Sequence, residues 1–311
     1  MAQHFPKPGS DSLLRLFLGL IAAGVPSLAC AGDAATTVVE ADVTEETEWV
    51  RLLRTEGGKA KALETSIVRF TKGDTVVDLI GAIHVGDKAY YEALNDRFED
   101  YEAVLYELVA EKDAIKKGTR AAKNDRGASM SLIGSMQTGM KDLLELEHQL
   151  SLIDYRADNM VHADMSPKQF AEKMQERGES WFTMFMNIMT KSMAAQSKSG
   201  RPPSDFEIIA MLFDKDRATK LKGLMAEQFT QMDVLTDTFS GPDGSTIITE
   251  RNAVALDELK KQLAAGQTEI GIFYGAGHMP DMEERLIEDF GFERGETTWL
   301  TAWNIAGDDS N

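Results

Sequence analysis

The chain has 311 residues, with 33 Lys and Arg against 51 Asp and Glu and a formal net charge of −18. This excess of negative charge argues against binding to nucleic acid or to anionic lipid, because both need a basic face. The single cysteine, Cys30, excludes an internal disulfide and a cysteine-rich zinc module. With 43% hydrophobic residues the chain can bury a sizeable core, so wholesale disorder is also excluded.

The first 31 residues have the layout of a secretory signal peptide. A polar stretch containing Lys7 precedes a short apolar run, residues 13–28, and small residues surround Cys30. The apolar run is short for a membrane-spanning helix, which needs about 20 residues. We therefore expect an exported protein, periplasmic or on the outer surface, cut after Ala31. Cleavage before Cys30 is the alternative, and it would leave a lipid-modifiable cysteine as a membrane anchor.

Residues 32–48 are acidic and rich in threonine, and we expect them to be a tether that leads into a single domain over residues 49–306. Strand and helix patterns alternate within this domain, which predicts an α/β fold with a mainly parallel central sheet flanked by helices. A helix is predicted after Asp87, its expected cap, and another over Asn252–Leu263. The main predicted strands are Thr75–Ile83, Ala103–Val109, Thr246–Thr249, Glu269–Tyr274 and Trp299–Ile305.

Residues 113–245 lack a convincing strand pattern and hold 13 of the 16 methionines. We interpret them as a large, Met-rich helical insertion that covers the sheet. Its most apolar predicted helix, residues 181–193, is expected to pack in the core. A substrate groove or a homodimer contact is the alternative, because methionine surfaces adapt to varied partners.

The strongest functional signal is a G-x-x-H sequence that occurs twice. Gly81 to His84 and Gly275 to His278 each end a buried strand and precede a helix. Ligands bind at the carboxyl ends of strands in open α/β sheets, and glycines allow the backbone to approach a ligand closely. Gly81, Gly275 and Gly277 are therefore candidate site residues beside His84 and His278. If the two strands are neighbours, both histidines face one crevice.

Charged residues elsewhere supply further candidates. Glu107 lies within an apolar predicted strand, where a lone carboxylate is unfavourable unless it is paired with an arginine or bound to a metal. Arg251 can hold Glu107, bind a substrate anion or remain a solvated charge at a helix start. His162 and Asp164 belong to a polar cluster that either approaches the crevice or forms a solvated loop between helices.

These residues together resemble the TraB/TIKI (GumN, PrgY) family, which is marked by two G-x-x-H motifs, a glutamate and an arginine in this order. The matching positions are His84 and His278 with their glycines, Glu107, and Arg251 within Glu250-Arg251-Asn252. The resemblance covers roughly residues 50–306 and is weakest in the Met-rich middle. It implies the fold of the erythromycin esterase and ChaN-like group and, for the TIKI branch, a protease dependent on manganese or cobalt.

The leading hypothesis is a metal-dependent hydrolase, a peptidase acting on a peptide or protein substrate. His84, His278 and Glu107 would bind a divalent metal, with manganese or cobalt favoured over zinc. Glu107 and Arg251 would be the catalytic residues, Arg251 stabilising an oxyanion or orienting Glu107. A histidine acting as a general base without metal is a variant. The alternatives are a non-catalytic peptide- or haem-binding envelope protein, with a histidine or Tyr274 on iron, and an envelope interaction protein that uses its Met-rich surface.

Overall fold

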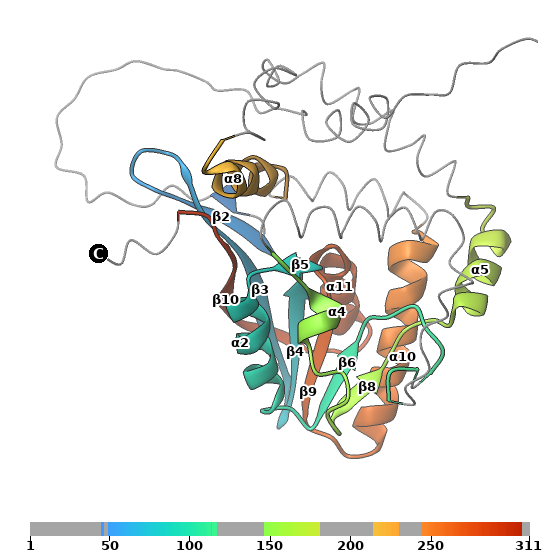
Figure 1. Cartoon of the computed structure of the whole chain (residues 1–311). Helices are drawn as coiled ribbons and strands as arrows, with labels where there is room; N and C mark the ends of the chain where they lie inside the picture. The colour runs from blue at the N-terminus through green and yellow to red at the C-terminus, as the bar shows by residue number, and fades with distance from the viewer. Residues whose placement is uncertain are drawn as a thin grey trace, which may run out of the picture.

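The computed structural model describes residues 45–46, 49–112, 114–116, 146–180, 214–229 and 244–306. These residues form an α/β protein in which eight strands make one mixed sheet with helices against it (Figure 1). Cys30, the predicted signal segment and most of the predicted 113–245 insertion, including the apolar helix expected over residues 181–193, lie outside the described residues.

One half of the sheet is parallel and contains the strand ends that carry the candidate residues. β4 pairs with β9, β9 with β6, and β6 with β8, all in parallel. The strands are β4 (Thr75–Ala82), β9 (Glu269–Gly275), β6 (Ala103–Tyr106) and β8 (Met160–His162). Their carboxyl ends therefore meet at one edge of the sheet.

The other half is antiparallel and is built around the long strand β3. β3 pairs with β2 through its first half, with β4 through its second half, and with β10 along its other side. β1 extends this half by pairing with β2. The strands are β1 (Glu45–Glu46), β2 (Val50–Arg54), β3 (Ala60–Lys72) and β10 (Glu293–Asn304). A separate two-stranded sheet joins β5 (Val85–Gly86) to β7 (Glu147–His148).

Helices cover both faces of the parallel half. The chain runs from β4 through α2 to β6, and later from β8 through α10 back to β9, so right-handed crossovers place α2 and α10 on opposite faces (Figure 1). α11 contacts both α10 and β4. The helices are α2 (Lys88–Phe98), α4 (Gln149–Leu152), α5 (Pro167–Glu176), α8 (Arg217–Phe229), α10 (Arg251–Ala264) and α11 (Met279–Glu288), with a π-helical turn η1 (Thr246–Glu250) and a 3-10 turn η2 (Ala276–His278).

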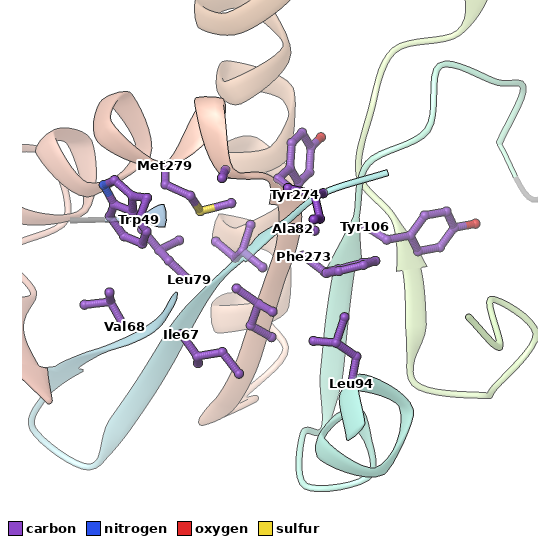
Figure 2. Close-up of a cluster of buried hydrophobic side chains, with 14 of the residues drawn as sticks. Trp49, Ile67, Val68, Leu79, Ala82, Leu94, Tyr106, Phe273, Tyr274 and Met279 are labelled. Atoms are coloured by element: carbon purple, nitrogen blue, oxygen red, sulfur yellow. The ribbon is translucent and has the colours of Figure 1, made fainter. Parts of the chain in front are cut away.

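The core lies where these helices meet the sheet. Figure 2 shows the cluster, in which Leu79 of β4 and Phe273 of β9 are joined by Leu94 of α2 and Met279 of α11. All four side chains are completely buried. The apolar runs of β4 and β9 thus have helices on both faces, as expected for strands in the interior of a parallel sheet.

Short-range signals in the sequence set several helix ends, although the expected cap at Asp87 does not form. Ser166 and Gln169 form a complete capping box at the start of α5, and Pro280 lies in the first turn of α11. Gly291, just beyond α11, has a φ of 69°, the left-handed conformation that suits glycine after a helix. Asp87 precedes α2, but its carboxylate bonds Lys222 Nζ and the backbone N–H of Asn304 instead of capping the helix.

Other local predictions are wrong. Thr246–Thr249 is a helical turn, because the Ser245 hydroxyl accepts the Ile248 N–H and starts a helix that continues into α10. The 113–245 segment contains two strands, β7 and β8, whose two and three residues are too short to show an alternating pattern. Glu107 lies just after β6 and not within it. Glu45–Glu46, inside the expected tether, forms β1.

A buried carboxylate in the middle of β4 yields a test of stability. Asp78 is fully buried, and it accepts hydrogen bonds from Arg69 at 3.0 Å, Arg97 at 3.1 Å and Tyr101 at 2.7 Å. We expect Asp78→Asn to lower the free energy of unfolding by about 1–3 kcal/mol, because a neutral amide cannot accept all of these hydrogen bonds, and Arg69 and Arg97, which are only partly buried, can turn to solvent. Chemical denaturation measures this. Glu92→Gln, which breaks the exposed Lys88–Glu92 pair, should change it by about 0.5 kcal/mol or less. Equal losses of stability in Asp78→Asn and Glu92→Gln would contradict the stabilising role of the Asp78 network.

Candidate functional site

Three neighbouring parallel strands deliver the candidate residues to one place. His84 follows β4, His278 follows β9 in the turn η2, and Glu107 directly follows β6. The order β4–β9–β6 places His278 on the middle strand of the three. The edge formed by these carboxyl ends is where ligands bind in open α/β sheets.

Gly275 marks the point on which these side chains converge. A Cβ added to Gly275 would lie 3.3 Å from Glu107 Oε2, 3.8 Å from His278 Cδ2 and 3.9 Å from His84 Nε2. Those two imidazole atoms are therefore within about 8 Å of each other. The absent side chain of Gly275 keeps the space between the three groups open, and any larger residue would project into it.

The two other candidate glycines have different surroundings. A Cβ on Gly81 would lie 3.3 Å from the Ser66 carbonyl oxygen and 3.6 Å from Ala276 Cβ, so this glycine allows β4 to pack closely against β3 and η2. Gly277 lies within η2. Gly275 is thus the glycine whose missing side chain opens directly onto the two histidines and Glu107.

Glu107 is held by a buried ionic network. Arg251 Nη2 donates to Glu107 Oε1 at 2.6 Å, and the Gly275 N–H donates to Oε2 at 2.7 Å. The same guanidinium binds Asp164 through two hydrogen bonds, of 3.0 and 2.6 Å. Burial alone raises the pKa of the Glu107 carboxyl, but the charge of Arg251, the neighbouring histidines and the Gly275 N–H together outweigh it and hold that pKa well below its ordinary value. Glu107 is therefore ionised at neutral pH.

This network decides between the roles considered for Arg251. Its side chain is 9% exposed and engages two carboxylates, which leaves it oriented toward Glu107 and Asp164 and not toward solvent. The geometry therefore favours holding Glu107 over binding a substrate anion. It also gives Asp164 a defined position, since this carboxylate anchors the other side of the guanidinium.

The two histidines differ in exposure. His84 is exposed, and its Nδ1 lies 3.2 Å from Gln149 Oε1. His278 is buried, with Nδ1 2.6 Å from Asn252 Oδ1 and Nε2 3.7 Å from Glu107 Oε1. Burial lowers the pKa of the His278 imidazole to about 3, although the Glu107 charge opposes that shift. His278 is therefore a neutral imidazole at pH 7.

His162 and Tyr274 have structural contacts. His162 is buried, and its Nε2 lies 2.6 Å from the Leu108 carbonyl oxygen, so that nitrogen is engaged with the main chain. The Tyr274 hydroxyl donates to the Ala163 carbonyl, and burial raises its pKa well above the ordinary value. A protonated, hydrogen-bonded phenol is a poor iron ligand, which weakens the haem-binding alternative through Tyr274.

The donor set at Gly275 suits a divalent cation in chemistry and charge. Imidazole nitrogen and carboxylate oxygen are ligands of manganese, cobalt and zinc. Two ligand atoms on one such ion lie about 3–3.5 Å apart, close to the 3.7 Å between His278 Nε2 and Glu107 Oε1. Glu107 and Asp164 together exceed Arg251 by one negative charge. The described ranges contain no group of three His, Cys, Asp or Glu side chains already close enough to hold one ion.

Sequence reasoning missed two residues that contact the histidines. Asn252 directly follows Arg251, so the Glu250-Arg251-Asn252 segment contained its signal. Gln149 has no comparable signal, because it lies in a short helix, α4, beyond a segment outside the described residues. Only its position in space reveals it.

No protein-family model, curated protein or solved structure matches this chain. Across the part of the chain that the structure describes, every helix is too short or too polar to cross a membrane. The function of this chain is therefore inferred from the geometry at Gly275 and from the chemistry of the residues around it.

The low pKa of His278 predicts a pH-dependent stability. Between pH 3 and pH 6.5 the unfolded chain protonates this histidine while the folded chain does not, so falling pH favours unfolding. For metal-free protein, we expect the wild type to lose about 1.4 kcal/mol more per pH unit below 6.5 than His278→Gln. Urea denaturation at pH 7 and pH 5 measures the difference. Parallel pH profiles of the two proteins would show that His278 titrates normally.

Proposed function

We propose that this chain is an exported, metal-dependent hydrolase that cleaves a peptide or protein substrate. The observation that carries the proposal is the convergence of His84, His278 and Glu107 on Gly275, at the carboxyl ends of three adjacent parallel strands. A neutral buried imidazole, an exposed imidazole and an ionised carboxylate are the kinds of ligand that divalent metals bind. This donor set therefore favours a metal site over a purely structural cluster.

In this proposal His84, His278 and Glu107 would hold the ion, Arg251 would hold Glu107, and Asp164 would anchor Arg251. A divalent cation supplies Lewis acidity toward a carbonyl and lowers the pKa of bound water. The Gly275 N–H and Arg251 keep Glu107 ionised, which makes it a good ligand and a weak proton acceptor. We therefore assign Glu107 to binding and orienting the ion, and not to accepting a proton as a general base.

Exposure decides the direction from which a substrate arrives. His278 is 5% exposed and Arg251 8% exposed, while His84 is exposed. In the proposal a substrate carbonyl therefore reaches the site from the His84 side, because His278 and Arg251 are buried. Without a metal, His84 is the histidine placed to accept a proton from water, which is the remaining variant of the hydrolase.

The resemblance to the TraB/TIKI family supports the reaction class. Its motif residues are those that the structure gathers at Gly275, together with Arg251 behind them. From that resemblance we propose peptide bond hydrolysis and a preference for manganese or cobalt over zinc. Export follows from the signal-like first 31 residues, with a lipid anchor at Cys30 as the alternative form of the mature protein.

Metal retention is the first test of this proposal. We expect His84→Ala and His278→Ala each to lower bound manganese or cobalt at least 10-fold, because each removes one of three ligands. Elemental analysis of protein purified without chelator measures metal per folded molecule. His162→Ala is the matched control, since it removes a buried histidine that contacts a main-chain carbonyl. Wild-type protein that binds no divalent metal would reject the metal-dependent mechanism.

Hydrolysis by a Glu107→Gln variant is the second test. The substitution keeps the volume of the side chain and removes its charge, so we expect turnover per folded molecule to fall about 10–100-fold or more, because loss of a proposed ligand costs at least as much as loss of a residue that orients one. Cleavage of a peptide library, corrected for the folded fraction, gives the measurement. Asp78→Asn is the control for losing a buried carboxylate away from the site. Undiminished turnover by Glu107→Gln would reduce Glu107 to a structural partner of Arg251.

A further inference from the structure

Each of the two site histidines is held at two points by one amide residue. The Gln149 backbone N–H donates to the His84 carbonyl at 3.0 Å, and Gln149 Oε1 lies 3.2 Å from His84 Nδ1. Asn252 Nδ2 donates to the His278 carbonyl at 2.9 Å, and Asn252 Oδ1 lies 2.6 Å from His278 Nδ1. The same two atoms of each histidine, the carbonyl oxygen and Nδ1, are engaged although the partners come from α4 and α10.

The orientation of the Asn252 amide follows from its other partners. Its nitrogen contacts the His278 carbonyl oxygen and Asp281 Oδ2 at 2.7 Å, and both of these atoms only accept hydrogen bonds. The Nδ2 group must therefore face them, which turns Oδ1 toward His278 Nδ1. An amide oxygen only accepts, so the hydrogen between these atoms belongs to Nδ1. The lone pair of the neutral imidazole is then on Nε2, the nitrogen nearer Glu107.

Gln149 contacts His84 in a corresponding way. Its Nε2 donates to the Tyr155 hydroxyl at 2.7 Å, and its Oε1 faces His84 Nδ1. Gln149 is 5% exposed, so its amide is fixed by protein contacts and not by water. His84 Nε2 is the nitrogen near Gly275, and it carries the lone pair when Nδ1 carries the hydrogen.

We propose that Asn252 and Gln149 are positioning residues that fix both histidines as Nδ1–H tautomers, with the Nε2 lone pairs turned toward the space at Gly275. This inference rests on the proposed metal site, whose ligands need unprotonated Nε2 atoms. Hydrogen-bond acceptors on the distal nitrogen are known to set the tautomer and ring orientation of metal-binding histidines. Arg251 and Asn252 are adjacent in the chain, so the start of α10 orients Glu107 and His278 together.

The tautomers are measured by NMR of metal-free protein that is labelled with nitrogen-15 at histidine. We expect Nδ1–H for His84 and His278 in the wild type, assigned by comparison with His84→Ala and His278→Ala. In Asn252→Leu, the favoured tautomer of His278 should change to Nε2–H, because only that form can donate to Glu107 Oε1. In Gln149→Met, His84 should lose its single tautomer. The two variants test the proposal separately, so misfolding of one leaves the other decisive.

Metal affinity, measured also for a conservative variant, distinguishes a positioning role of Asn252 and Gln149 from a general contribution to the stability of the fold. Asn252→Leu and Gln149→Met should bind manganese or cobalt 10–100-fold more weakly than wild type. Gln149→Glu keeps an acceptor on His84 Nδ1 and should restore both the tautomer and the affinity. Asn159→Ala is the control, since it removes an amide that donates to the Phe98 and Tyr101 carbonyls and should change neither readout.

Failure of the positioning roles and failure of the proposed metal site give different results. Folded Asn252→Leu and Gln149→Met variants with wild-type tautomers would overturn the positioning roles, whatever the metal content. Wild-type protein with the expected tautomers but no bound metal would leave the positioning roles in place and reject the proposed metal site. The NMR measurement needs neither metal nor substrate, so the two failures are distinguishable.

Discussion

The contact of one guanidinium with two buried carboxylates is the interaction on which the rest of the site depends. Arg251 joins Glu107 after β6 to Asp164 after β8, and it does so from the first residue of α10. Burying three charges is unfavourable unless the partners are close and hydrogen-bonded, and here the N–O distances are 2.6–3.0 Å. The network therefore ties α10 to two strand ends and fixes the carboxylate that faces the histidines.

Two ionic networks in this protein have different surroundings, one around Asp78 in the middle of β4 and one around Arg251 at the carboxyl ends of β6 and β8. Around Asp78, two arginines and a tyrosine saturate one carboxylate within the sheet. Around Arg251, the carboxylates outnumber the cation, and Glu107 keeps lone pairs that its two N–H donors do not use. The first arrangement satisfies its charges locally. The second leaves a negative excess beside two imidazoles, which is the electrostatic condition for holding a cation.

Sequence analysis predicted the residues whose position follows from strand order. His84 and His278 each follow an apolar run, so the carboxyl edge of a parallel sheet was enough to bring them together. Glu107 was predicted within its strand, and it joins them because β6 ends one residue before it. The same reasoning failed for Thr246–Thr249, where a serine cap outweighs β-branched residues. It could not find Gln149, whose contact with His84 spans 65 residues and depends on how α4 lies against the end of β4. Local patterns do not encode such contacts.

The distance along the chain between the parts of the site has a consequence for protein synthesis. The Glu107–Arg251 pair spans 144 residues, and the bond from Gly275 to Glu107 spans 168. His84 and Glu107 leave the ribosome long before α10 and β9, which provide the guanidinium, Gly275 and His278. A growing chain therefore carries the candidate residues His84 and Glu107 apart from their partners until α10 and β9 have been made. The fold itself delays assembly of the site until both segments have been synthesised.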